Sequence, residues 1–364
     1  MGTVHISYPK LRRTRLGYKL LKKCTVLLFL TVLFIFHWQS SAFSYEFTPF
    51  TEDLLENQTI QIINPLTNRV VKTIIPNDYQ LVTNMEDFKK EMEIWARDFA
   101  KGFNTQHGFN KPLLLDRIDE NGNIIKGRPM ITIDEPQLVE NILQQSFTGG
   151  KVDLPIIFTE SDYKQEDVPF LDEVTLSSFT TIFNGANFGR SKNIELSAIA
   201  IHNIIVGVGD VFSFNLVVGP REVATGYQVA PEIVKGKLVK GIGGGICQTS
   251  STLFNAVDFL DVKTIERHHH SRTVGYVPEG RDATVSFGGL DYRFQNTTGI
   301  PFLIKTIYRK GSITVMITTS REYANILKNE LSYEKKGETL SFFVFIGFLL
   351  YNLEYIHVEI FWKG

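Results

Sequence analysis

The sequence predicts an α+β protein with two successive domains, and three observations support this fold class. The first half of the chain combines short alternating apolar segments with two amphipathic helical patterns. The second half is dense in short alternating segments, which are typical of a mixed or antiparallel sheet. Within that half, a glycine-rich loop leads directly into a helical pattern. The 364 residues, 43% hydrophobic and 21% charged, suffice for two modest hydrophobic cores.

The chain begins with a basic tail that is followed by an apolar segment. Residues 1–23 carry seven lysines and arginines and no acidic residue. Residues 24–38 form an apolar run shorter than the roughly 20 residues that span a bilayer, so they are either a signal-peptide core or an uncleaved membrane anchor. In both cases the positive-inside rule places the body of the chain outside the cytoplasm. We therefore expect a cell-membrane or exported protein that contacts the membrane through this segment.

The next predicted unit, residues 45–165, is an α+β module. Its elements are two strands and two helices, at residues 58–65, 69–76, 83–103 and 134–147. The first helix begins with a capping box at Thr83 and the second with Asp134 as its cap. Residues 166–173, charged and without periodicity, are expected to link this module to the next domain.

Residues 174–320 predict a second domain on a mixed or antiparallel sheet. A helix is expected from Ser191 to about Val206, in which His202 is a packed or surface histidine, and a second helix over residues 248–260. The expected strands lie at residues 210–220, 263–271, 282–289, 291–296, 302–309 and 312–319. Residues 321–364 form an atypical apolar tail.

The stretch "GIGGGICQTSST", residues 241–252, contains Cys247, the only cysteine outside the N-terminal apolar segment. Because Cys24 lies in that segment, Cys247 has no partner for an intrachain disulfide, and an unpaired thiol in an oxidising compartment needs a reason. The stretch does not fit the phosphate-binding loop pattern. That pattern has a lysine directly before the hydroxyl residue, and this stretch has none. Two interpretations stay open: a buried cysteine that fills space, and a nucleophile.

A cysteine in the first turn of a helix favours the nucleophile, because the positive end of the helix dipole stabilises a thiolate. Backbone amides of Gly244, Gly245 and Cys247 could then accept the negative oxygen of a tetrahedral intermediate. Such an arrangement is typical of acyl transfer. The alternative is that the glycines only allow close packing of a helix on a strand.

A nucleophilic cysteine needs a base, and "ERHHHS" supplies three of the eight histidines. On a strand, His268 and His270 would point to one face and His269 to the other, so one of the first pair is the expected base. Asp282 is a candidate to orient it, and Arg281 a candidate to hold a substrate carboxylate. A zinc site formed by His268, His270 and Cys247 is the competing interpretation.

The run "FSFNLVVGPREVATGYQVAPEIVKGKLVKGIGGGICQTSSTLFNAV", continued by "ERHHHSRTVGYVPEGRDATVSFGGLDYRFQN", strongly resembles the VanW-like family from about residue 173 to residue 320. The resemblance implies an envelope protein, and for some family members a cysteine-dependent L,D-transpeptidase that acts on peptidoglycan stem peptides. The family motifs fall on Gly243, Gly244, Gly245, Cys247, Gln248, His268, His270 and the segment Gly280 to Thr284. Residues 45–165 more weakly resemble a peptidoglycan-binding module, and the tail after Ser320 departs from the family.

Two functions are therefore expected alternatives: a cysteine-dependent peptidoglycan transpeptidase, and a non-catalytic peptidoglycan-binding or vancomycin-resistance accessory protein. The expected catalytic residues are Cys247, His268, His270 and Asp282. The expected substrate-binding residues are Gly243, Gly244, Gly245, Gln248, Ser250, Ser251 and Arg281. We expect no cofactor and no metal, peptidoglycan stem peptides as partners, and no nucleic acid, since the net charge is -1.

Overall fold

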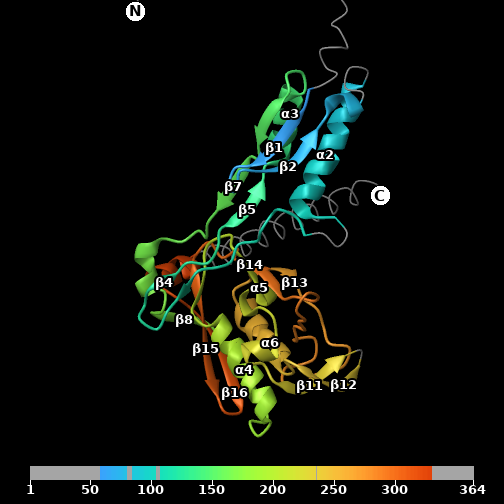
Figure 1. Ribbon diagram of the computed structural model, residues 1–364. Coiled ribbons are helices and arrows are strands. Elements are labelled where there is room, and N and C mark those ends of the chain that lie inside the picture. Colours follow the sequence, from blue (N-terminus) through green and yellow to red (C-terminus); the bar gives the residue numbers. More distant parts are fainter. Residues whose placement is uncertain (1–57, 80–83, 104–106, 235, 330–364) are drawn as a thin grey trace, which may run out of the picture.

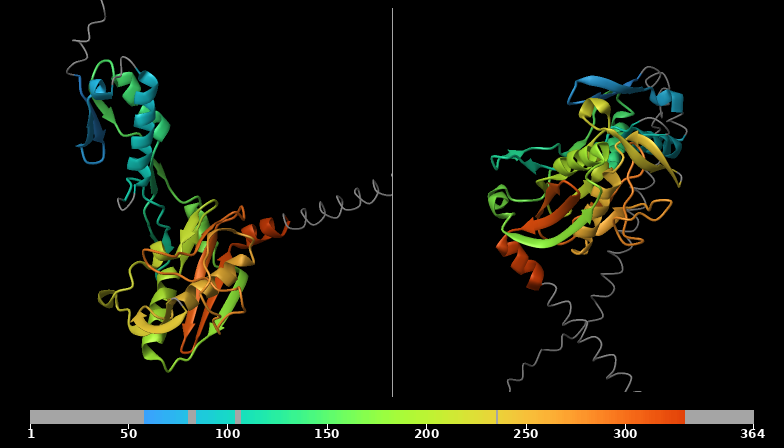
Figure 2. Two further views of the ribbon diagram at one scale, coloured as in Figure 1. Left: turned by 90° about the vertical axis from the view of Figure 1, so that its right-hand side faces the viewer. Right: turned by 90° about the horizontal axis from the view of Figure 1, so that it is seen from below.

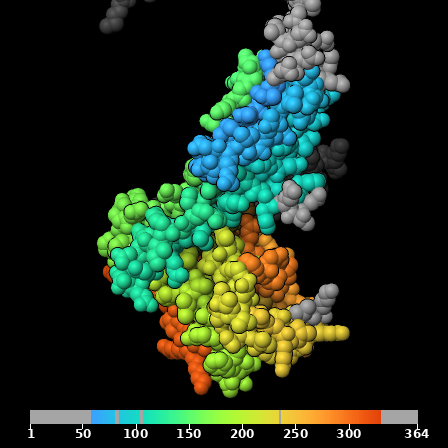
Figure 3. Space-filling model, in the orientation of Figure 1, coloured from blue at the N-terminus to red at the C-terminus, as the bar shows by residue number. Residues whose placement is uncertain are grey.

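The computed structural model describes residues 58–79, 84–103, 107–234 and 236–329. These residues form two lobes, of which the N-terminal one projects from the C-terminal one (Figures 1 and 3). Helices and mainly antiparallel sheets occur in both lobes, which confirms the predicted α+β class. The expected basic tail, the expected apolar segment and the C-terminal tail beyond residue 329 lie outside the described residues. Among the described helices, none has the length and apolar character needed to cross a bilayer.

The N-terminal lobe packs two helices against small sheets. Its elements are β1 (Ile60–Asn64), β2 (Arg69–Ile74), η2 (Pro76–Tyr79), α2 (Met85–Lys101), β5 (Met130–Ile133), α3 (Glu135–Gln145), β6 (Gly150–Asp153) and β7 (Ile156–Thr159). Helix α2 is capped by Asn84, which accepts the N–H of Asp87, rather than by Thr83. Asp134 caps α3 as predicted. The apolar stripes of both helices form one core with β1, which is why the helical periodicity identified them correctly.

The C-terminal lobe is built on one six-stranded antiparallel sheet in the order β4-β3-β9-β15-β16-β8. These strands are β3 (Arg117–Ile118), β4 (Ile124–Ile125), β8 (Val174–Ile182), β9 (Ile204–Val206), β15 (Phe302–Arg309) and β16 (Ser312–Thr319). Helices α4 (Phe188–Ile201) and α6 (Ile246–Asp258) pack side by side on this sheet, as Figures 1 and 2 show. Helix α6 is buried along nearly its whole length, so the residues at its start are held rigidly.

Smaller elements complete the lobe. They are β10 (Val211–Ser213), α5 (Phe214–Val218), η4 (Val223–Thr225), β13 (Lys263–Glu266), β14 (Arg293–Gln295) and the two-stranded ribbon of β11 (Val229–Val234) and β12 (Lys237–Ile242). The ribbon leads through the glycines directly into α6, which confirms the predicted passage from a glycine-rich loop into a helix.

Residues 117–125, which the sequence placed in the N-terminal module, supply two strands of the C-terminal sheet. Arg117 in β3 pairs with Ile204 in β9. The expected linker forms η3 (Gln165–Phe170), and Val168 and Leu171 are buried against Ile205 of β9 and Leu303 of β15. Hydrogen bonds and apolar packing therefore join segments on both sides of the domain boundary that the sequence predicted.

Four predicted elements differ from the structure. The expected strand 210–220 is strand only over β10, because the Ser213 side chain caps α5, which follows it directly. Helix α4 ends at Ile201 rather than near Val206, because Asn203 adopts a positive φ of 59° and β9 then pairs with β15. Residues 268–270 and 282–289, which were predicted as strands, form irregular loop segments instead. His202 packs as expected and accepts the backbone N–H of Thr306 at 2.9 Å.

Candidate active site

The glycine-rich turn between β12 and α6 places Cys247 at the second residue of the helix. Gly245, the N-cap, has a φ of 109°, which residues with a Cβ rarely adopt. A Cβ on Gly244 would lie 2.5 Å from the carbonyl oxygen of Ala230, so the turn packs directly on the β11 backbone. The thiol consequently lies where the helix dipole favours negative charge.

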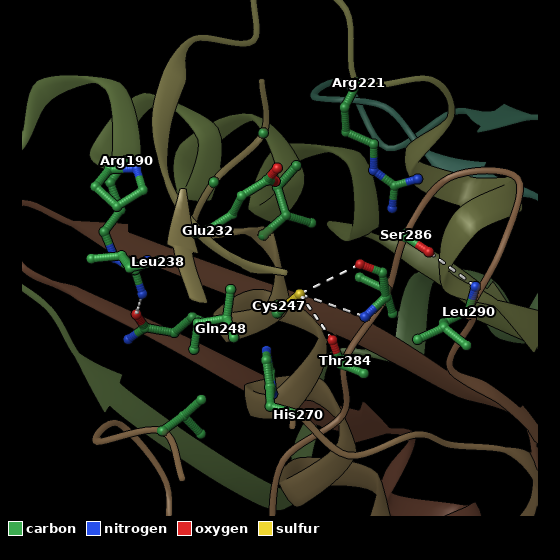
Figure 4. A pocket seen from close by; sticks show the side chains of 18 of the residues that line it. Arg190, Arg221, Glu232, Leu238, Cys247, Gln248, His270, Thr284, Ser286 and Leu290 are labelled. Carbon is green, nitrogen blue, oxygen red and sulfur yellow. Dashed lines mark hydrogen bonds between the residues drawn. The ribbon is translucent and has the colours of Figure 1, made fainter. Parts of the chain in front are cut away.

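Two arginine stems pack against the same turn from different elements. A Cβ on Gly245 would lie 2.8 Å from Cγ of Arg190 in α4, and a Cβ on Gly243 would lie 3.2 Å from Cβ and Cγ of Arg221. Figure 4 shows these two arginines on opposite sides of Cys247. Because Gly243 and Gly245 have no side chains, the stems of Arg221 and Arg190 can pack beside the thiol.

The partly buried thiol contacts a loop that lies far from it in the sequence. Its Sγ accepts the backbone N–H of Val285 at 3.5 Å and lies 3.4 Å from the carbonyl oxygen of that residue. Thr284 Oγ1 is 3.6 Å from Sγ, and Figure 4 shows all three contacts. The backbone donor can stabilise a thiolate, while the carbonyl can accept the proton of the neutral thiol.

His270 and Asp282 form a buried pair next to the thiol. Nδ1 of His270 lies 2.6 Å from Oδ2 of Asp282, and the backbone N–H of His270 donates to the same oxygen at 2.7 Å. Their side chains are 7% and 9% exposed. Because Nδ1 is taken, Nε2 is the nitrogen left to face Cys247 (Figure 4). The arrangement is a cysteine, a base and an orienting carboxylate in the order that nucleophilic catalysis requires.

The electrostatics of these three groups favour charge separation. Burial raises the pKa of Cys247, but hydrogen bonding and charge from His270, together with the Val285 amide, lower it by more, so the pKa falls below its ordinary value. Burial lowers the pKa of His270, whereas Cys247 and Asp282 raise it by more. Burial also raises the pKa of Asp282, yet its bonds to His269 and His270 bring it down to about 2. Both shifts act in the direction of a thiolate–imidazolium pair.

Cys247 and His270 line a cavity of about 850 Å³ between the β11–β12 ribbon and the loops after β13. A cavity of this size accommodates a short peptide or a drug-sized molecule. Its lining includes Arg190, Arg221, Glu232, Cys247, Gln248 and His270. The thiol therefore has access to a ligand-sized space beside two arginines.

Residues 189–318, which contain all of these groups, match the protein family described as VanW like protein. A Bacillus subtilis (strain 168) protein called Uncharacterized protein YoaR is 42% identical over 205 residues, which are 56% of this chain and 68% of that protein. The chain belongs to the VanW-like family. The Vancomycin B-type resistance protein VanW of Enterococcus faecalis (strain ATCC 700802 / V583) is 31% identical over 119 residues, which are 31% of this chain and 42% of that protein. No solved structure matches the chain.

In this VanW-like chain the three neighbouring histidines have different surroundings. His268 Nε2 lies 3.0 Å from Oε1 of Glu266, and the structure does not bring it to the thiol. His269 Nδ1 lies 2.8 Å from Oδ1 of Asp282, with a side chain that is 52% exposed. The expected strand alternation is wrong, because Asp282 contacts two consecutive histidines in an irregular segment. Only His270 combines burial with access to Cys247.

The two serines after the cysteine fasten α6 to the segment that carries Asp282. Ser250 Oγ donates to the carbonyl oxygen of Ala283 at 2.6 Å, and Ser251 Oγ accepts the N–H of Ala283 at 2.9 Å. Both side chains are buried and lie outside the lining of the cavity. The structure therefore gives Ser250 and Ser251, expected as substrate-binding residues, a positioning role.

Gln248 and Arg281 are both engaged with other protein groups. Gln248 lines the cavity, where its Oε1 accepts from Nη2 of Arg190 at 2.7 Å. Arg281 lies outside the cavity lining and donates from Nη1 to Asp258 at 2.6 Å. The expected carboxylate-binding role of Arg281 thus finds no support in its position.

Sequence reasoning missed Arg190 and Arg221, which flank the thiol instead. No spacing rule connects these two arginines to residue 247, because they come from α4 and from the loop after α5. The single available signal was their position beside glycine and proline in "NFGRS" and "VGPRE".

The structure does not bring together the three residues that the competing zinc interpretation expected as ligands. Within the described ranges no group of three or more histidines, cysteines, aspartates or glutamates is placed to hold a metal ion. His268, one of the three expected ligands, pairs with Glu266 rather than pointing toward Cys247. The donor geometry therefore fits proton transfer between a thiol and an imidazole better than metal coordination.

Proposed function

We propose that this chain is a bacterial cell-envelope protein in which Cys247 performs acyl transfer on peptidoglycan stem peptides, with chemistry of the L,D-transpeptidase type. The observation that carries the proposal is the buried Cys247–His270–Asp282 constellation, which opens into a cavity at a helix N-terminus. A cysteine that only filled space would need neither the paired imidazole nor the cavity.

In the first step, Nε2 of His270 takes the proton of Cys247 and Sγ attacks a peptide carbonyl carbon. The new C–S bond gives a tetrahedral intermediate whose oxygen carries the negative charge. The backbone N–H of Cys247 is the donor assigned to that oxygen, because those of Ile246 and Gln248 already donate to the carbonyl oxygens of Gly243 and Gly245. Asp282 holds the imidazole by its Nδ1 and stabilises the imidazolium.

In the second step, the C–N bond breaks, and the leaving amine takes the proton from the imidazolium. A thioester between Cys247 and the donor peptide remains. An acceptor amine, deprotonated by His270, then attacks this thioester and releases the thiolate, so a new amide bond forms and the enzyme is regenerated. Water in place of the amine would give hydrolysis.

The substrate class and the location come from the family and from the N-terminal sequence. One relative is named as a vancomycin resistance protein. Vancomycin acts on the cell wall, and the peptides of the cell wall are peptidoglycan stem peptides. The basic residues 1–23 before the apolar run support attachment to the membrane, or export, with the catalytic lobe outside the cytoplasm. We assign the N-terminal lobe to peptidoglycan binding as part of this proposal.

Intact-mass spectrometry of the full-length chain, purified in detergent and incubated with a stem tetrapeptide, tests the proposal. The expected result is a covalent adduct with the mass of the acyl tripeptide, which disappears on treatment with hydroxylamine. Cys247→Ser is the matched variant and should show no thioester while it keeps the same circular dichroism spectrum. New cross-links in muropeptides from cells that express the wild type, but not the variant, would extend the result to the envelope.

A different result in the same experiment would contradict the proposal. If both chains bind the tetrapeptide with the same affinity and neither forms an adduct nor new cross-links, the chain is a non-catalytic binding protein.

A further inference from the structure

The guanidinium of Arg221 is buried in the wall of the cavity without a polar partner. Both Nη1 and Nη2 are inaccessible to solvent and make no hydrogen bond to any described residue. No described carboxylate lies within ion-pair distance of them, although Glu222 and Glu232 line the same cavity. A buried charge with unused donors is unfavourable, so such a group calls for an anionic partner.

The surroundings fix the orientation of this side chain. The guanidinium carbon lies 5.7 Å from the ring centroid of Phe214 and 5.6 Å from that of Phe287. The stem of Arg221 packs against Gly243 in the turn that precedes Cys247. Two aromatic rings and the glycine turn thus hold the planar group beside the thiol, and Figure 4 shows Arg221 directed into the same space as Cys247.

The second arginine of the wall provides a contrast. Arg190 already donates from Nη2 to Gln248 at 2.7 Å and stacks over Tyr276. On Arg221 the two unused nitrogens are the terminal pair of the guanidinium. This pair is the edge that binds both oxygens of a carboxylate in parallel.

We infer that Arg221 is the carboxylate-binding residue of the cavity and that it holds the donor peptide by a carboxylate close to the bond that Cys247 breaks. This inference rests on the proposed function for the choice of peptide. A carboxylate would satisfy Nη1 and Nη2 together and would neutralise the buried charge. Peptides that lack that carboxylate would leave the pair unsatisfied, so they bind more weakly.

Binding measurements on the full-length Cys247→Ser chain test the inference without any turnover. The probes are the tetrapeptide L-Ala-γ-D-Glu-L-Lys-D-Ala and two single amides of it, one at the C-terminal carboxylate and one at the free carboxylate of glutamate. We expect one of the amides to bind about tenfold more weakly or worse than the free acid by isothermal titration calorimetry. The weakened amide identifies which carboxylate Arg221 holds.

Adding Arg221→Gln should weaken the free acid by a similar factor and leave the affinity of that amide unchanged. Arg221→Lys keeps the charge but not the paired donors, so an intermediate loss is expected. Arg309→Gln removes an exposed arginine at the end of β15 and serves as the matched control.

Two results overturn the inference: no binding of the free acid, or an Arg221→Gln variant that weakens the acid and both amides equally. Failure of the proposed function has a different signature. In that case the peptide binds through Arg221, but the wild-type Cys247 forms no thioester. A chain whose Cys247 is acylated at the same rate by the free acid and by both amides keeps its proposed function and loses the Arg221 assignment.

Discussion

Asp282 contacts His270 twice through one oxygen, accepting the backbone N–H at 2.7 Å and lying 2.6 Å from Nδ1 of the ring. The double contact fixes both the main chain and the imidazole plane of the base. The remaining oxygen of the carboxylate contacts His269 at 2.8 Å. One buried carboxylate therefore fixes both His269 and His270.

Replacement of Asp282 by asparagine should reduce acyl transfer strongly while the fold is retained. The amide cannot stabilise an imidazolium, and it can favour the wrong tautomer of His270, so we expect a loss in kcat/KM of about 10²-fold or more. Initial rates of thioester formation measure this effect. A loss smaller than threefold would show that the carboxylate has only a structural part. Glu266→Gln, which affects the partner of His268, is the control and should leave the rate within about twofold.

Alkylation of Cys247 by iodoacetamide should begin at a pH below that of an ordinary thiol. The hydrogen bond and charge of His270 lower the pKa of Cys247 against the effect of burial, so thiolate is present at a pH where a free cysteine is protonated. In His270→Gln these contributions disappear, and the rising limb of the rate–pH profile should move to higher pH. Superimposable profiles for the two chains would contradict the assignment of His270 as the partner.

Stability should decrease at low pH through Asp282. Its pKa is depressed from 3.8 to about 2, so the carboxylate stabilises the fold above about pH 4, and this contribution is lost as the pH falls toward 2. Because the side chain is 9% exposed, the contribution is on the order of 2 kcal/mol. Urea denaturation of wild type and Asp282→Asn should show a gap in unfolding free energy that narrows by this amount between pH 5 and pH 2. A difference in unfolding free energy that stays constant with pH would contradict this role of Asp282 in stability.

Substitution of Gly245 by alanine should destabilise the C-terminal lobe and displace Arg190. The new Cβ would lie 2.8 Å from Cγ of Arg190, and the φ of 109° is strained for alanine, so we expect a loss of about 2–3 kcal/mol. Gly280→Ala is the matched control, because its φ is also positive at 74° but no atom lies within 4 Å of the new Cβ. Thermal unfolding compares the two variants. Equal losses would indicate that backbone strain alone matters at position 245.

Local patterns predicted much of the fold. The apolar stripe of α2 and the capping aspartate of α3 appear in the structure as expected, because each depends on residues within one or two helical turns. The end of α4 and the loop at 268–270 were not predictable in this way. Their conformations depend on β15 and on Asp282, which are remote in the sequence.

The sequence by itself determined the family, the α+β class and the placement of one unpaired cysteine in the first turn of a helix, since glycine spacing and helix periodicity are local properties. Tertiary structure decided which histidine faces that cysteine and which arginines flank it. His270 is selected by its contact with Asp282, and Arg190 and Arg221 reach the turn only because Gly245 and Gly243 lack side chains. These are contacts between segments brought together by packing, and no pattern of neighbouring residues encodes them.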